Sequence, residues 1–85
     1  MTTLFIIEDE GHAEWLPHEF NTFEDALDEV HRLVAIPWDS EPNRAPCTNW
    51  QSCGRNWVIL QFDNSTLPHW TELTRTAVAE VRKGA

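Results

Sequence analysis

The stretch from Ala45 to Trp57, APCTNWQSCGRNW, holds the residue types of this chain that are best suited to chemistry. It contains both cysteines, two of the five tryptophans and one arginine, and it has no acidic residue. Cysteine thiolates bind metals and form disulfides, whereas arginine and tryptophan recognise anionic, cationic or planar groups. The stretch is therefore a candidate metal site, redox pair or ligand-binding loop, and the alternative to all three is an ordinary packed loop.

Cys47 and Cys53 are separated by five residues, which is wide for either kind of cysteine chemistry. Structural zinc sites use about two to four intervening residues and need four ligands, and thioredoxin-like pairs use about two. Both cysteines are thus weak metal candidates, and no cofactor is expected. A disulfide between them is sterically possible, but the favoured interpretation is a pair of reduced thiols that help the loop to pack.

A surface for a ligand or protein partner is the second interpretation of this region. Arg44, Trp50 and Arg55 interleave cationic and aromatic side chains, and Trp38 lies earlier in the same proline-containing loop. The competing structural interpretation, which we favour, has the arginines pair with the protein's own acidic helix while Trp57 joins the core.

The net charge of the chain limits which kinds of partner it can bind. The chain has 14 acidic and six basic residues, for a net charge of −8, and most of the acids lie in its first half. Such a surface repels phosphate, which argues against direct binding of nucleic acid or of an anionic membrane. The carboxylates of residues 8–10 and 24–29 are expected to be solvated on a turn and on a helix surface. With no recognisable catalytic motif either, we expect a protein that is not an enzyme.

The hydrophobic pattern predicts the elements of the fold. A strand is expected over residues 3–8, then a turn near Gly11, and a second strand over 12–20 that Pro17 places at a sheet edge. A helix is expected over residues 21–36, capped by Asn21 or Thr22. Its apolar stripe is expected to comprise Phe23, Ala26, Leu27, Val30 and Val34, and Asp28 is expected to pair with Arg32. A loop over 37–56 leads to a strand over 56–63. The segment 66–83 carries helix signals, although its threonines favour a strand.

These elements predict one domain over residues 1–85, of α+β class. The expected fold is a two-layer sandwich in ββαβα order, with a three-stranded antiparallel sheet in strand order 2-1-3 and both helices on one face. The alternative makes the last segment a fourth strand. No signal peptide or stretch of about 20 apolar residues is visible, so we expect a cytoplasmic protein without a membrane partner.

The stretch PWDSEPNRAPCTNWQSCGRNWVILQFD, residues 37–63, resembles a group of short bacterial proteins without assigned function. They are similar to it in a PNRAPCTxWxxCGR-like loop that follows a helix opening with a TFEDAL-like phrase. The resemblance implies a bacterial or phage origin. It implies no activity and no site residue.

Three functional hypotheses remain. The first is a non-enzymatic interaction domain that binds another protein or itself, as a homodimer, through the loop and an open sheet face. The second is a small-ligand or metal-binding module that uses the loop 44–57. The third is an acidic inhibitor that imitates nucleic acid through residues 8–10 and the first helix.

Overall fold

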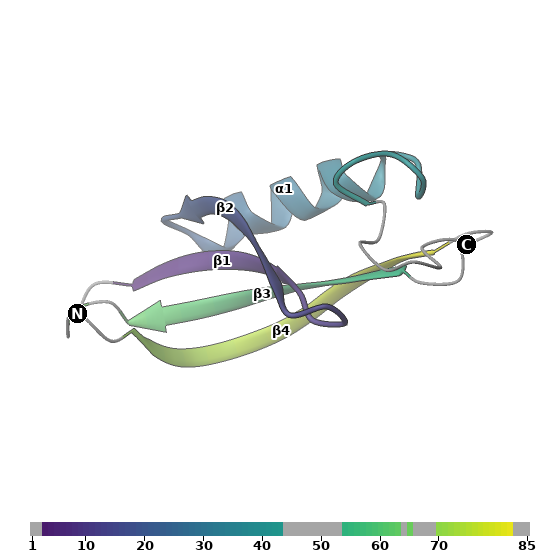
Figure 1. Ribbon diagram of the computed structural model, residues 1–85. Helices are drawn as coiled ribbons and strands as arrows, with labels where there is room; N and C mark the ends of the chain where they lie inside the picture. Colours follow the sequence, from purple (N-terminus) through teal and green to yellow (C-terminus); the bar gives the residue numbers. More distant parts are fainter. Residues whose placement is uncertain (1–2, 44–53, 64, 66–69, 83–85) are drawn as a thin grey trace.

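The computed structural model describes residues 3–43, 54–63, 65 and 70–82. In this part of the chain, four strands form one antiparallel sheet beside one helix (Figure 1). The elements are β1 (Thr3–Asp9), β2 (Glu14–Phe20), α1 (Phe23–Val34), β3 (Gly54–Asp63) and β4 (Thr71–Arg82). The sheet order is β2-β1-β3-β4, so the α+β class and the 2-1-3 order of the first three strands are confirmed.

The last segment corrects the main prediction. It is the strand β4 rather than a helix, so the sheet has four strands, and the four-strand alternative was right. β4 pairs with β3 from Asp63↔Thr71 to Gly54↔Arg82. Its threonines are β-branched and suit a strand, and the long pairing outweighs the local helix signals. The expected second helix on the sheet is therefore absent over 71–82.

The helix prediction is confirmed for α1. Thr22 is the N-cap, and its Oγ1 accepts a hydrogen bond from the backbone N–H of Asp25 at 3.1 Å. Two details differ from expectation. Leu33 is buried whereas Val34, expected in the apolar stripe, is 45% exposed. Arg32 pairs with Glu29 rather than with the predicted partner four residues before it.

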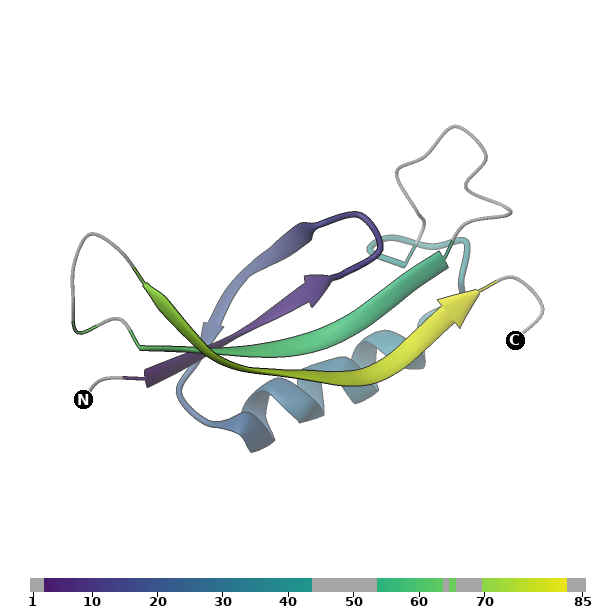
Figure 2. The same ribbon diagram turned by 90° about the horizontal axis from the view of Figure 1, so that it is seen from below.

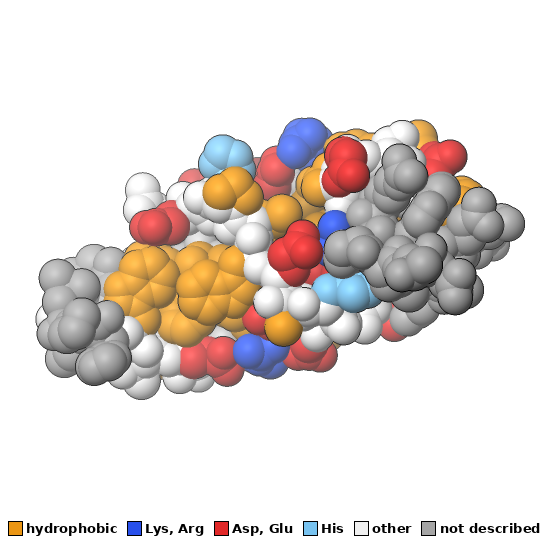
Figure 3. All heavy atoms as spheres, in the orientation of Figure 1, with side chains coloured by type: hydrophobic (Ala, Val, Ile, Leu, Met, Phe, Trp, Pro, Cys, Tyr) orange, Lys and Arg blue, Asp and Glu red, His pale blue; other side chains and the backbone are white. Residues whose placement is uncertain are grey.

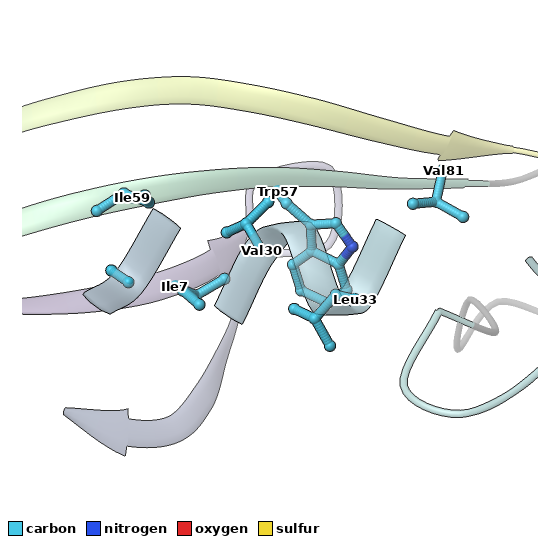
Figure 4. Close-up of a cluster of buried hydrophobic side chains, with 7 residues drawn as sticks. Ile7, Val30, Leu33, Trp57, Ile59 and Val81 are labelled. Atoms are coloured by element: carbon cyan, nitrogen blue, oxygen red, sulfur yellow. The ribbon is translucent and has the colours of Figure 1, made fainter. Parts of the chain in front are cut away.

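The main core lies between α1 and one face of the sheet, as the close-up in Figure 4 shows. Trp57 is only 1% exposed there, which confirms its predicted place in the core. In Figure 2, which looks onto the opposite face, the helix lies farther from the viewer than β3 and β4 and is partly hidden by β4. The buried members of this core are Ile7, Ala26, Val30, Leu33, Trp57, Ile59 and Val81.

The face of the sheet opposite α1, called here the outer face, carries a second apolar cluster. Its side chains are at most 6% exposed, and Trp70 packs against them. Because these side chains are buried within one chain, the outer face is not the broad open apolar surface that the sequence suggested. The buried members are Leu4, Ile6, Val58, Leu60 and Phe62.

Candidate functional site

The structure places two of the loop residues that the sequence singled out. Trp38 is partly buried and packs against the core beneath α1, and Arg55 lies near the start of β3. Arg44, Cys47, Trp50 and Cys53 lie outside the described residues.

Arg55 is a buried residue that makes internal contacts. Its side chain donates from Nη1 to Oδ2 of Asp9 at 2.8 Å and from Nε to the carbonyl of Pro42 at 3.0 Å. The guanidinium also lies 5.6 Å from the ring centroid of Trp57 and 3.4 Å from a carboxylate oxygen of Glu14. The carboxylates come from β1 and β2, not from the acidic helix that the sequence suggested. Arg55 thereby fastens the segment after α1 to the sheet.

Asp9 is the buried centre of this network, with no exposed surface. Besides Arg55, it accepts hydrogen bonds from the backbone N–H groups of Gly11 and Asn56 and contacts Nδ1 of His12 at 2.5 Å. Burial is the largest single influence and opposes ionisation. Arg55, the amide of Asn56 and His12 together outweigh it, so the pKa of Asp9 is lowered below its usual value.

The expectation that residues 8–10 form a solvated turn is wrong for the first two. Glu8 is 7% exposed and Asp9 is fully buried, because β1 continues through Asp9. A strand that continues to Asp9 puts that residue on the same face as Ile7, which is buried in the main core. The alternation of side chains along the strand could therefore have predicted that Asp9 is buried. The identity of its partner could not be predicted in this way, because Arg55 lies 46 residues away in the sequence.

On the outer face, Arg75 of β4 forms ion pairs with three carboxylates. Its Nη1 lies 2.6 Å from Glu8 and 2.8 Å from Glu10, and its Nη2 lies 2.9 Å from Glu72. The hydrogen bonds that Arg75 donates to these carboxylates, led by those to Glu72, raise the pKa of Arg75 above its usual value. Since three carboxylates surround one guanidinium, the cluster keeps an excess of negative charge.

An aromatic cluster lies beside these charges on the outer face, and we call Trp15, Phe62 and Trp70 the aromatic platform. The two indoles are stacked, with centroids 6.4 Å apart and planes 9° apart, and each contacts Phe62, at 5.2 and 5.7 Å. Trp15 is 47% exposed, and its Nε1 donates to Glu8 at 2.9 Å. Figure 3 shows hydrophobic side chains gathered where β3 ends and β4 begins, with charged side chains at their border.

An open groove of about 340 Å³ lies further along the same strands. It follows a register shift in which Trp57 pairs with Ala79 but Val58 pairs with Ala77, so that β4 has an extra residue there. The residues that shape the groove include Glu10, Asn56, Val58, Ala77, Val78 and Glu80.

Within the described residues, no group of three or more His, Cys, Asp or Glu side chains is placed to hold a metal ion. None of the described helices has the length and apolar character needed to cross a membrane.

Comparisons with family models, curated proteins and solved structures found no match to this chain. The resemblance of residues 37–63 to short bacterial proteins therefore stays a prediction.

Proposed function

We propose that this chain is a non-enzymatic interaction domain that binds another protein through the aromatic platform on the outer face of its sheet. The observation that carries the proposal is the exposure of Trp15, 47% of its surface, in stacked contact with Trp70 above the buried ring of Phe62. Tryptophan is enriched among the residues that dominate binding energy at protein interfaces.

The platform is rigid, which favours binding. The Trp15 indole is held by its hydrogen bond to Glu8 and by its contacts with Trp70 and Phe62. A side chain already fixed in one orientation loses little conformational entropy when a partner covers it. The contact with a partner therefore keeps most of the free energy gained by burying the exposed ring.

Charge favours a basic partner over a second copy of this chain. The chain has a net charge of −8, and Glu8, Glu10 and Glu72 lie beside the platform. Two such surfaces repel each other, whereas a partner with lysine or arginine is attracted and positioned. The self-association suggested by the sequence also loses support, since the five clustered side chains Leu4, Ile6, Val58, Leu60 and Phe62 of the outer face are already buried within one chain.

The structure gives less support to the other two hypotheses, a ligand or metal site and imitation of nucleic acid. A ligand or metal site at Cys47 and Cys53 lies outside the described residues and stays a prediction. Imitation of nucleic acid needs a row of exposed carboxylates, but Glu8 and Asp9 are buried and paired with arginines.

The test is selection of peptides from a random display library on the intact domain, followed by affinity measurement with purified peptides. We expect selected peptides to be basic and to bind Trp15→Ser at least tenfold more weakly than the parent. Val34→Ser is the matched control, since Val34 is exposed to a similar extent, 45%, but lies on α1. Its affinities should equal those of the parent.

Two outcomes contradict the proposal. One is a set of selected peptides whose affinities are the same for the parent and for Trp15→Ser. The other is sedimentation of the parent as a stable dimer that Trp15→Ser converts to monomer, because the platform would then be a contact between identical chains.

A further inference from the structure

We infer that the groove at the register shift between β3 and β4 receives a cationic side chain, arginine or lysine, from the same partner that covers the aromatic platform. This inference rests on the proposed function and adds the chemistry of the partner. It makes the outer face a two-point recognition surface, with an aromatic contact at one end and a charge-specific contact at the other.

The space for the side chain comes from the bulge. Where Val58 pairs with Ala77 and Trp57 pairs with Ala79, the extra residue Val78 bends β4 away from regular pairing. The small side chain of Ala77, which pairs with Val58, leaves a volume of about 340 Å³ above the buried side chain of Val58. That volume is within the range of natural small-ligand pockets, about 300–1,000 Å³.

The charge of the lining selects a cation. The carboxylates of Glu10 and Glu80 border the groove, and its described lining residues include no lysine or arginine. Glu10 shares Arg75 with Glu8 and Glu72, so the single guanidinium does not neutralise the three carboxylates. A guanidinium or ammonium group entering the groove gains charge-assisted hydrogen bonds there, and its aliphatic stem contacts alanine and valine.

The two points of recognition lie on one face and in one line. Val58 and Phe62 belong to the same strand and to the same outer cluster. Four residues of strand span about 13 Å, so an extended partner segment can contact both points with residues about four positions apart. Peptides that bind the whole surface should therefore carry a basic residue about four positions from an apolar or aromatic one.

The probe is N-acetyl-arginine amide, titrated into the ¹⁵N-labelled full chain and followed by two-dimensional amide NMR spectra. We expect saturable shifts confined to the amides of Glu10, Asn56 and 77–80. The corresponding lysine derivative should produce the same pattern. The citrulline derivative has nearly the same shape as arginine but no charge, and it should produce no saturable shift.

Three variants locate the site. Glu10→Gln should weaken arginine binding at least threefold, and Ala77→Leu should abolish it by filling the groove. Glu19→Gln, which removes an exposed carboxylate on β2, is the matched control and should bind as the parent does. Amide dispersion in the same spectra shows whether each variant is folded. If Ala77→Leu does not fold, Glu10→Gln still tests the inference.

Equal shifts with arginine and citrulline would overturn the inference. So would arginine shifts spread equally over the acidic first turn of α1, since these indicate unspecific attraction to negative charge.

The experiments distinguish failure of the groove inference from failure of the proposed function. Peptides that need Trp15 but not Glu10 or Ala77 would leave the proposed function standing without the groove. Arginine binding in the groove without any peptide that needs Trp15 would remove the proposed function instead.

Discussion

The indole N–H of Trp57 donates a hydrogen bond to Oδ1 of Asn43 at 3.1 Å, and both side chains are buried. The amide Nδ2 of Asn43 in turn donates to the carbonyls of Leu33, at 2.7 Å, and Ile36, at 2.9 Å. Carbonyls at the end of a helix have no partner within the helix itself. Asn43 therefore satisfies the end of α1 and fastens the following segment to the central strand β3.

Replacing Asn43 with alanine removes these three hydrogen bonds and leaves the buried indole N–H of Trp57 without its acceptor. We expect Asn43→Ala to lower the free energy of unfolding by about 3 kcal/mol, at about 1 kcal/mol for each bond. Urea denaturation monitored by tryptophan fluorescence measures the change. Asn21→Ala, at an exposed position before α1, is the control and should stay within about 0.5 kcal/mol of the parent. Similar losses for both variants would contradict the assigned role.

The Asp9–Arg55 pair predicts a strong effect of a single charge. Asp9→Asn removes the buried carboxylate that lies closest to the guanidinium of Arg55, and removal of one partner from a buried pair costs about 3–5 kcal/mol. We expect a loss of this size at neutral pH in urea denaturation. The exposed Glu19→Gln should change the stability by less than about 0.5 kcal/mol. A loss below about 1 kcal/mol for Asp9→Asn would show that the pair contributes little.

The same pair predicts a pH dependence. The pKa of Asp9 is lowered in the folded chain, so its ionised form stabilises the fold. This stabilisation is fully present above the ordinary pKa of 3.8 and is lost as the pH falls through the lower folded value. The parent should therefore lose stability as the pH falls below about 4, and Asp9→Asn should lose less. A slope that Asp9→Asn leaves unchanged would assign the acid sensitivity to Glu29 and Asp63, whose pKa values are also lowered.

The turn between β1 and β2 predicts a stabilising substitution. The sequence predicted a turn near Gly11, and in the structure it is Ala13 that has a φ of 51°. A left-handed conformation costs a residue with a β-carbon about 1 kcal/mol relative to glycine. We expect Ala13→Gly to raise the free energy of unfolding by about 1 kcal/mol, which in a domain of this size raises the melting temperature by about 4–8 °C.

Its control is Ala77→Gly, since Ala77 is also exposed but lies in β4. Glycine weakens a strand interior, so this variant should melt at a lower temperature than the parent. Destabilisation by both glycine substitutions would mean that the backbone at position 13 is not strained by alanine.

The sequence by itself was enough to predict the elements that depend on neighbouring residues, such as helix caps, apolar spacing and proline positions. The capping residue Thr22 and the apolar spacing of Ala26 and Val30 were enough to place α1. The missing N–H of Pro17 placed β2 at an edge, because a proline cannot complete the pairing of a central strand. The apolar run of residues 3–8 likewise placed β1 in the middle of the sheet, whereas the predicted three-stranded order left β3 at an edge, and only the pairing with β4 makes β3 an interior strand.

Tertiary structure alone decided the features that depend on contacts between distant residues. Residues 71–82 carry both helix and strand signals, and pairing with β3 selected the strand. The Asp9–Arg55 contact joins residues 46 positions apart, and the Arg75–Glu8 contact joins residues 67 positions apart. A carboxylate can be buried only where the fold places a cationic or hydrogen-bonding partner beside it. The local sequence does not show whether such a partner from a distant segment will be present. For the same reason, the binding surface proposed for this protein lies on a sheet face that forms only when β2, β3 and β4 come together.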